Sequence, residues 1–394
     1  MNKKFQRTIR VANIVEEGRL GGPQMRMALV TSELNRSKFK KKIDTTFIFP
    51  KNNSKEFRER CEKNGIKYFL FSLSSISRNW INIIKYLISF PFEVLMLSKF
   101  FKEHSFDIVH ISSGSRSFKS IIAARISKTK VVWELNDTYA PIIIRCIFFC
   151  LSHLANNFIF GSDSTEKYYK RLNPKNRRNF LIQSPVDVDF FNPIFEYQNE
   201  EFIKKLVKEK KIIIGTVTNV SPVKGLLSFL RIAKSLSSYS NKVVFIVVGS
   251  VHNSQRNYYE SLLDNINREG VKNFFFLGPR TDVRPLLKVM NIYVCSSNYE
   301  SSPLSVWEAM SMKKAIISND VGDVSKFITN NVSGFVVKKD DDATLIKHLK
   351  KLIHNSKLRN TLGKSARKQA KNKLDLKICA THHLKMYQEI FNHN

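Results

Sequence analysis

The stretch Glu300-Ser301-Ser302-Pro303-Leu304-Ser305-Val306-Trp307-Glu308 places two carboxylates eight positions apart across the predicted start of a helix. Pro303 has a fixed φ that suits the first helical position, and the Ser302 hydroxyl can accept a hydrogen bond from a free N–H group. We therefore predict a loop over residues 296–302 and a helix over 304–312. Its free N–H groups, at Leu304 and Ser305, and the positive end of its dipole suit a diphosphate.

The two glutamates have different places in this unit. Glu308 lies in the second turn, where it can reach two neighbouring hydroxyls of a sugar, whereas Glu300 stays in the loop. Apolar, β-prone runs at residues 292–297 and 314–317 predict a strand, loop, helix and strand in succession. Ligands of open α/β sheets bind beyond the carboxyl ends of the strands, where this loop would lie. Either glutamate alone would most often be an ordinary solvated residue, so the functional interpretation depends on the combination.

This region resembles the retaining family 4 glycosyltransferases of GT-B fold, whose signature is an E-x7-E element. Similar runs occur at residues 276–278, 282–283, 308–310, 320–322 and 333–336. The resemblance is specific in the carboxy-terminal half and looser over the rest of the chain. It implies an α/β fold of two Rossmann-like parallel-sheet domains facing across a cleft. It also implies that Glu308 binds the nucleotide ribose, Glu300 the hydroxyls of the transferred sugar, and Lys224 the diphosphate.

Lys224 lies in the run Val220-Ser221-Pro222-Val223-Lys224-Gly225, between a predicted strand at 212–218 and a predicted helix at 226–235. A lysine at that corner can neutralise a diphosphate together with the free N–H groups of the helix. Surface lysines are common, so the interpretation of Lys224 as a diphosphate-binding residue depends on its combination with Glu308. The family usually has an arginine five positions earlier, where this chain has Asn219. The resemblance further implies that the loop around Gly278 and Arg280 lies near the nucleotide base.

A second candidate loop, Gly21-Gly22-Pro23, follows the first predicted strand and opens a helix. Two glycines let the backbone approach a ligand closely, although a simple tight turn is an equally good interpretation. The pattern is not G-x-G-x-x-G, which argues against an oxidoreductase. The resemblance implies that Gly21 and Gly22 face the donor phosphates and the acceptor.

Residues 133–137 (WELND) carry a departure from the family, because many members have a histidine where this chain has Asn136. Asparagine can hydrogen-bond a sugar hydroxyl but cannot exchange a proton. The retaining mechanism implied by the resemblance survives this change, since the departing phosphate oxygen takes the acceptor proton. We therefore expect Asn136 to position the sugar, and we expect His110 to have a structural role.

The length of 394 residues fits two domains. We predict an acceptor-side domain over residues 1–191, a linker over 192–211, a nucleotide-sugar-binding domain over 212–375 and a helix over 376–394 that crosses back. Predicted strands in the first domain are 9–15, 45–49, 67–71, 107–111, 130–133, 157–160 and 179–183, with helices at 23–34, 54–64, 80–102 and 118–127. Pro91 is expected to interrupt the third helix. Predicted strands in the second domain are 212–218, 243–248, 273–277, 292–295, 315–317 and 334–337.

The net charge of +32 predicts an anionic partner. The sequence lacks a zinc-finger spacing, an RNP-like motif and a basic zipper, so we favour an anionic membrane surface over nucleic acid. Apolar segments at 81–101 and 142–160 contain charges and are poor membrane spans. They are either half-buried helices of the first domain or carry a face that lies in the membrane interface. The polar start of the chain predicts a cytoplasmic protein, peripheral on the inner face of the cell membrane.

Metal and redox chemistry are not expected. Five cysteines without a C-x-x-C pair predict neither a disulfide nor a zinc site. Asp340-Asp341-Asp342 could be mistaken for a D-x-D metal motif, but it directly precedes a predicted helix and is expected to cap it. We therefore expect no cofactor and no metal.

These observations predict a retaining glycosyltransferase. It would move a sugar from a nucleotide-sugar donor to a lipid-linked or other cell-surface saccharide acceptor. At Asn136 and Asn219 the chain lacks the histidine and the arginine that are usual in the family. These differences leave an alternative, a non-catalytic GT-B scaffold that binds nucleotide or a partner. The presence of both Glu300 and Glu308 argues against that alternative.

Overall fold

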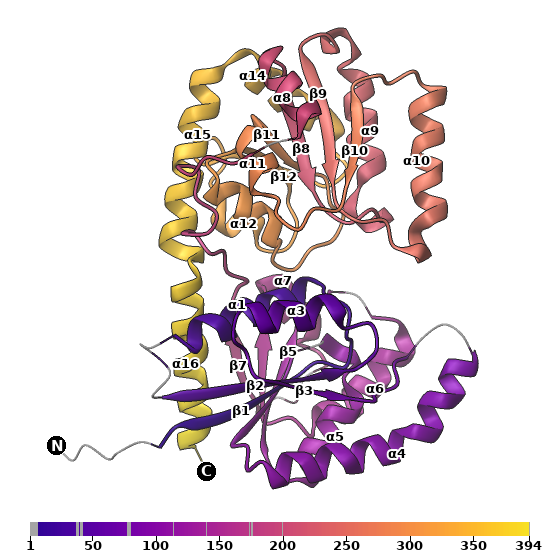
Figure 1. Ribbon diagram of the computed structural model, residues 1–394, viewed down its shortest axis with the longest axis vertical. Helices are drawn as coiled ribbons and strands as arrows, with labels where there is room; N and C mark the ends of the chain where they lie inside the picture. The colour runs from indigo at the N-terminus through magenta and orange to yellow at the C-terminus, as the bar shows by residue number, and fades with distance from the viewer. Residues whose placement is uncertain are drawn as a thin grey trace, which may run out of the picture. The chain divides into compact units, whose positions relative to one another are not determined.

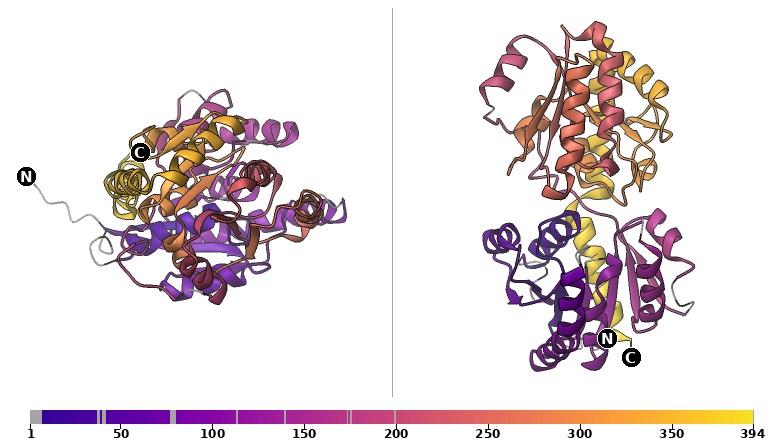
Figure 2. Two further views of the ribbon diagram at one scale, coloured as in Figure 1. Left: turned by 90° about the horizontal axis from the view of Figure 1, so that it is seen from above. Right: turned by 90° about the vertical axis from the view of Figure 1, so that its right-hand side faces the viewer.

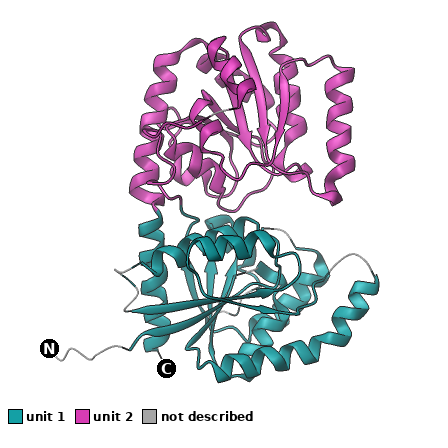
Figure 3. Ribbon diagram, viewed as in Figure 1, with its two compact units in different colours: residues 1–185, 376–394 teal, residues 186–375 magenta. Residues whose placement is uncertain are grey.

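The computed structural model describes residues 7–36, 39, 42–76, 80–112, 114–138, 140–172, 174, 176–198 and 200–393. The chain forms two compact units, residues 1–185 with 376–394 (unit 1) and residues 186–375 (unit 2; Figure 3). Each unit contains one parallel sheet flanked by helices, as predicted. Residues 192–211, predicted as a linker, lie in unit 2 and include α8 (Glu201–Lys208), while α16 (Leu376–Asn392) lies in unit 1.

The sheet of unit 1 has seven strands in the order β3-β2-β1-β4-β5-β6-β7. Buried apolar runs form its central strands, which is typical of a parallel sheet covered on both faces. The strands are β1 (Ile9–Ile14), β2 (Ile43–Pro50), β3 (Tyr68–Phe71), β4 (Ile108–Ile111), β5 (Lys130–Leu135), β6 (Asn157–Phe160) and β7 (Arg178–Leu181).

Helices cover both faces of this sheet. One face packs against α1 (Gly22–Leu34), α3 (Lys55–Lys63) and α16, the yellow helix in Figures 1 and 2. The other face packs against α4 (Trp80–Glu103), α5 (Phe118–Ile126), α6 (Ile142–Ser152) and α7 (Asp163–Tyr169). The expected interruption at Pro91 is wrong, because α4 continues through this residue. Pro91 is exposed, so its ring and the carbonyl it leaves unpaired face outward.

The sheet of unit 2 has six strands in the order β10-β9-β8-β11-β12-β13. The strands are β8 (Ile212–Val217), β9 (Val243–Val248), β10 (Phe274–Gly278), β11 (Ile292–Cys295), β12 (Ala315–Asn319) and β13 (Phe335–Val337). The helices besides α8 are α9 (Leu226–Ser235), α10 (Arg256–Arg268), α11 (Arg284–Val289), α12 (Leu304–Ser311), α13 (Val324–Phe327), α14 (Asp342–His354) and α15 (Ser356–Gln369).

Both sheets reverse their strand order at one point, between β1 and β4 in unit 1 and between β8 and β11 in unit 2. The loops that leave the carboxyl ends of adjacent parallel strands diverge at such a point and leave a crevice in which ligands bind. In unit 2 these loops contain residues 218–225 and 296–303, and the loop after β12 contains residues 320–323. The fold therefore brings the two segments that the sequence singled out to the same edge of one sheet.

Candidate active site

An ion pair between Lys224 and Glu300 lies at the strand reversal of unit 2. Lys224 ends the short 3-10 turn η2 (Pro222–Lys224) after β8, and Glu300 lies in the loop after β11. The Lys224 Nζ atom is 2.6 Å from Glu300 Oε1, which also accepts a hydrogen bond of 2.8 Å from the Ser297 hydroxyl. The side chains are 26% and 16% exposed, so a ligand can reach both charges.

Hydrogen bonds between loops hold this pair in place. The Asn319 side-chain amide, at the end of β12, donates to the carbonyl oxygens of Ser296 (3.0 Å) and Ser297 (3.2 Å). The Ser296 hydroxyl donates to the Lys224 carbonyl oxygen at 3.1 Å. The loops after β8, β11 and β12 are therefore tied together around Lys224 and Glu300.

Two glycines allow the loops to approach this closely. Gly225 has φ +64°, and a Cβ atom there would lie 1.9 Å from the Ser296 carbonyl oxygen. Gly322 has φ +57°, and a Cβ atom there would lie 1.9 Å from the Ser301 carbonyl oxygen. Both positions combine a left-handed backbone with a neighbouring backbone atom that cannot move aside, so only glycine fits.

Helix α12 begins beside the pair at Leu304, as predicted. Pro303 is the residue before the first helical residue, and its carbonyl oxygen accepts the N–H groups of Val306 (3.0 Å) and Trp307 (3.3 Å). The Ser302 hydroxyl accepts a hydrogen bond of 3.2 Å from the Trp307 indole N–H. The buried Trp307 ring also packs edge to face against Phe327. The helix start is thus anchored to the core of unit 2 through Trp307.

The predicted binding residues of α12 lie at the boundary of the core. Leu304, Ser305 and Glu308 are half-buried, whereas Val306 and Trp307 are fully buried. Glu308 is in the second turn, as predicted. Its charge also reaches Tyr293 in β11, whose pKa is raised above its ordinary value, chiefly by burial.

Two other predicted residues have partners of their own. The Asn219 side chain, exposed after β8, accepts a hydrogen bond of 3.0 Å from the Ser250 hydroxyl. Arg280, after β10, forms an ion pair with Glu200 (2.7 Å) and donates to the Leu277 carbonyl oxygen. The Arg280 guanidinium is therefore held by groups of unit 2, at Glu200 and near the end of β10.

In unit 1, Gly21 and Gly22 lie at the start of α1, after β1. A Cβ atom at Gly21 would lie 3.1 Å from the Gln24 Oε1 atom, and a Cβ atom at Gly22 would meet nothing within 4 Å. Gly21 has an extended backbone at φ −134°, which any residue can adopt. Neither strain nor packing within unit 1 therefore requires glycine at position 22.

Asn136 belongs to a buried polar network that the sequence analysis missed. Its amide donates to Glu134 Oε1 at 2.6 Å. Glu134, fully buried in β5, is paired with Arg26 from α1 and is 2.9 Å from His110 Nε2 in β4. Burial alone would raise the pKa of the Glu134 carboxyl, but the Arg26 charge and the His110 hydrogen bond outweigh it and lower that pKa to about 2.

The network continues into α16. His110 Nδ1 is 2.6 Å from the Tyr387 hydroxyl, so the predicted structural role of His110 agrees with its buried position. His383 lies beside them, and burial and the Arg26 charge lower its pKa to about 3. A charged residue inside the apolar run 131–135 was the signal for this network, but its partners are distant in sequence.

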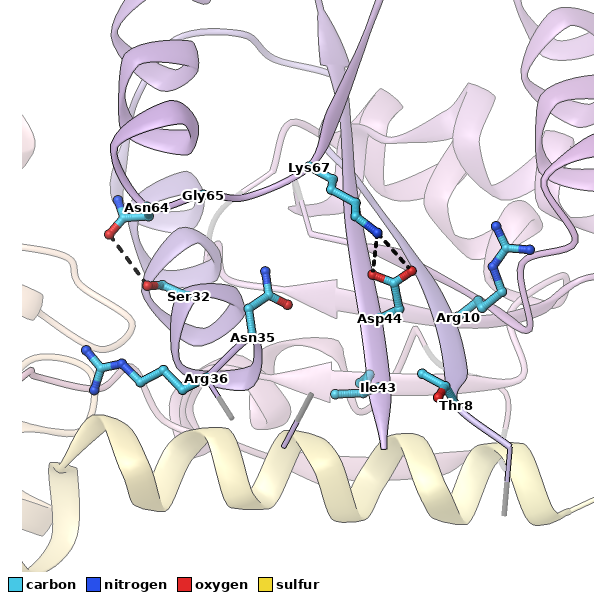
Figure 4. A pocket seen from close by; sticks show the side chains of 10 residues that line it. All are labelled: Thr8, Arg10, Ser32, Asn35, Arg36, Ile43, Asp44, Asn64, Gly65 and Lys67. Atoms are coloured by element: carbon cyan, nitrogen blue, oxygen red, sulfur yellow. Dashed lines mark hydrogen bonds and ion pairs between the residues drawn. The ribbon is translucent and has the colours of Figure 1, made fainter. Parts of the chain in front are cut away.

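A pocket on unit 1 lies at the edge of the sheet where β1 and β2 begin (Figure 4). The loops that follow the strands leave the opposite edge of this sheet. The pocket is lined by the residues that begin β1 and β2 and by the end of α1. Lys67 and Asp44 form an ion pair of 3.3 Å there. Because ligands of parallel sheets bind at the carboxyl ends of the strands, this pocket is separate from the candidate site.

Among the residues that the structure describes, no group of three or more His, Cys, Asp and Glu side chains has an arrangement that could hold a metal ion. Asp341 caps α14 by accepting a hydrogen bond of 2.9 Å from the Thr344 N–H group, as predicted. Asp342 pairs with Arg231.

Comparisons with known proteins show similarity to glycosyltransferases. Residues 198–369 match the family model described as glycosyl transferases group 1. The chain is 25% identical over 351 residues to the N,N'-diacetylbacillosaminyl-diphospho-undecaprenol alpha-1,3-N-acetylgalactosaminyltransferase of Campylobacter jejuni, covering 85% of this chain and 89% of the relative. It is 23% identical over 320 residues to the UDP-Gal:alpha-D-GlcNAc-diphosphoundecaprenol alpha-1,3-galactosyltransferase of Escherichia coli, covering 77% and 79%.

Solved structures show the same fold. HepE of Anabaena, crystallised with UDP and glucose, has a TM-score of 0.80 at 16% identity and covers 96% of this chain and 99% of its own. A glycosyltransferase of Rickettsia africae has a TM-score of 0.80 at 17% identity, covering 98% and 100%. The fold class predicted from the sequence is thereby confirmed as GT-B. Residues 198–369, which carry the similarity to the group 1 glycosyl transferases, lie in unit 2.

Proposed function

We propose that this protein transfers a glycosyl unit from a nucleotide-sugar to a lipid-linked or other cell-surface saccharide, with retention of anomeric configuration and without a metal. The observation that carries the proposal is the Lys224–Glu300 pair beside the start of α12, within the segment that matches the family. A cation and free helix N–H groups are suited to a diphosphate, and carboxylates are suited to sugar hydroxyls.

Each residue of the site has a proposed role. Lys224 neutralises the diphosphate, assisted by the helix start at Ser302, Leu304 and Ser305. Glu308 accepts hydrogen bonds from the ribose hydroxyls, and Glu300 accepts them from the transferred sugar. Asn219 takes the place of the arginine usual in the family, and Arg280 lies near the base once it releases Glu200.

In unit 1 we propose that Asn136 positions the transferred sugar and that the open space beside Gly22 admits substrate. Glu134 holds the Asn136 amide at 2.6 Å, which fixes its orientation. Because Asn136 cannot take a proton, the departing phosphate oxygen would receive the proton of the acceptor hydroxyl. Charge then accumulates on the diphosphate, where Lys224 acts.

The acceptor class is supported by the relatives. Two of them are named for diphospho-undecaprenol acceptors, and a Staphylococcus aureus relative, 24% identical over 212 residues, is named poly(ribitol-phosphate) alpha-N-acetylglucosaminyltransferase. A nucleotide-sugar donor is supported by HepE, which has been crystallised with UDP-glucose. We further propose that the protein works in the cytoplasm, at the inner face of the cell membrane, where a lipid-linked acceptor would be reached.

Thermal unfolding with UDP, GDP, ADP and TDP in the presence of chelator tests the proposed donor site. A ligand at one hundred times its dissociation constant stabilises the folded state by about 2.7 kcal/mol. We expect one nucleotide to stabilise the wild type and the Glu260→Ala control, whose carboxylate pairs with Arg256 on α10, but not Glu308→Ala. No response to any nucleotide would instead favour the non-catalytic scaffold.

A further inference from the structure

Helix α4 of unit 1 exposes an apolar face. Among the described residues, α4 is the one helix long and apolar enough to cross a membrane by length and composition. A core helix can pass the same test, but only 28% of its apolar window is buried. The side chains at its outward positions are each 45–71% exposed, and we call them the α4 face: Trp80, Ile84, Leu87, Ile88, Phe92 and Leu95.

The exposed side of α4 is more apolar than that of an ordinary water-facing helix, while its buried side includes a charged residue. Its buried side contains Glu93, which accepts a hydrogen bond from the Ser74 N–H group at 3.0 Å and lies 2.5 Å from the Nζ atom of the fully buried Lys119. Phe92, which precedes Glu93 in the chain, is the most exposed residue of the α4 face. A surface helix in water normally places its charges outside and its apolar residues inside. The six exposed apolar side chains of the α4 face depart from that pattern and indicate an apolar surrounding for this face.

Helix α6 extends the apolar surface. It lies on the same side of the unit 1 sheet, and α5 packs against both α4 and α6 (Figure 1). Ile142, Ile143 and Phe149 of α6 are exposed, and Ile126 at the end of α5 is exposed as well. An exposed apolar surface that extends over three neighbouring helices is typical of an interaction site.

The charges around this surface identify the occupant. Lys85, Lys99 and Lys102 are exposed on α4, and Arg145 is exposed on α6. The net charge of the chain is +32, so a second copy would be repelled, whereas an anionic lipid surface would be attracted. Val94 and Leu97 of α4 belong to the core of unit 1, so the helix cannot leave the sheet to span a bilayer.

We propose that the α4 face and the adjoining apolar residues of α6 insert into the interface of an anionic membrane. Helix α4 lies in the membrane plane, with its apolar side chains among the acyl chains and its lysines at the headgroups. This inference rests on the membrane location in the proposed function and names the surface that makes the contact. It is tested without donor or acceptor, so its failure would leave the proposed transfer standing.

The protein contains a built-in probe for this test. Of its three tryptophans, Trp133 and Trp307 are fully buried, whereas Trp80 is 69% exposed at the start of α4. Titration with vesicles of phosphatidylglycerol and phosphatidylcholine should shift the emission of the full chain to shorter wavelength, and brominated lipid should quench it. Trp80→Phe should abolish both changes. Pure phosphatidylcholine should give much weaker binding, and salt should weaken binding to the anionic vesicles.

Vesicle sedimentation identifies the surface. We expect Ile88→Glu/Phe92→Glu to lower the partition coefficient at least tenfold, and the matched control Ile194→Glu/Phe195→Glu, at exposed positions of unit 2, to leave it unchanged. All three proteins should have the same melting temperature, because the substituted side chains are exposed. Equal partitioning of both double variants would overturn the proposal. So would a wild-type dimer, detected by sedimentation velocity, that ignores vesicles and is dissociated by Ile88→Glu/Phe92→Glu.

Discussion

Lys224 and Glu300 illustrate what single residues contribute to this site. Each was predicted from its position at the end of a strand, but their contact of 2.6 Å was not, because they are 76 residues apart in sequence. In this structure the lysine charge is balanced by Glu300, so an incoming diphosphate would compete with that carboxylate for Lys224. The competition would release Glu300 toward the sugar at the moment when the donor binds.

Removal of the Lys224 cation should slow transfer more than it weakens binding. Charge accumulates on the leaving diphosphate in the transition state, and the loss of one preorganised electrostatic contact typically lowers kcat by about 10²–10³-fold. We expect Lys224→Ala to show such a loss in steady-state kinetics. The control is Lys234→Ala, which removes a lysine of α9 that is paired with Glu269. A kcat for Lys224→Ala within twofold of wild type would contradict its role.

At the scale of elements, the apolar runs predicted every strand of both sheets, with ends shifted by at most two residues. Buried parallel strands such as β9 (Val243–Val248) are continuous apolar runs rich in β-branched residues, which is why they are recognisable. Pro91 was misjudged because a proline can remain inside a helix where the freed carbonyl faces outward. The Glu134 network was missed because it joins Arg26 to a residue 108 positions away, and sequence pattern carries no signal over that distance.

The junction between η2 and α9 should not tolerate a side chain. Gly225→Ala would place Cβ 1.9 Å from the Ser296 carbonyl oxygen and push the β11 loop away from Lys224. Gly270→Ala is the matched control, because its φ of +63° is nearly the same but its Cβ would meet nothing within 4 Å. Thermal unfolding should show a larger loss of stability for Gly225→Ala and no stabilisation by nucleotide. Equal losses in the two variants would show that backbone conformation alone matters.

Helix α16 should make unit 1 sensitive to acid. The pKa of His383 is lowered from 6.5 to about 3, and that of Glu134 from 4.5 to about 2. Both groups bind fewer protons in the folded than in the unfolded state at intermediate pH. The stability they contribute is present above these unfolded values and is lost as the pH falls. For His383 alone the loss is about 2 kcal/mol between pH 7.5 and pH 5.

Denaturation as a function of pH measures this effect. His383→Gln replaces the imidazole with a polar amide that cannot titrate, so its stability should fall by about 2 kcal/mol less than that of the wild type between pH 7.5 and pH 5. The control is His382→Gln, at the neighbouring exposed position. The account of α16 fails if the two variants and the wild type have parallel stability curves.

At the scale of the whole molecule, the alternation of strands and helices predicted two parallel-sheet units. The boundary was less readable from sequence, because residues 186–211 include both extended segments and α8 and belong to unit 2. Unit 1 is completed by α16, which returns from the far end of the chain to pack against α1 and β1. Its apolar side chains join the core of unit 1, and the Tyr387 hydroxyl lies 2.6 Å from His110 Nδ1 there.

The central claim is that the loop edge of unit 2 binds a nucleotide-sugar and promotes transfer. The most direct test measures nucleoside diphosphate release from a panel of nucleotide-sugars in chelator, together with calorimetric binding, for wild type and Glu300→Gln. We expect one donor to be bound by both proteins with similar affinity and to be turned over at least 100-fold more slowly by Glu300→Gln. Equal turnover by the two proteins would contradict the role of Glu300, and binding without any turnover by the wild type, even with a lipid-linked saccharide present, would contradict transfer itself.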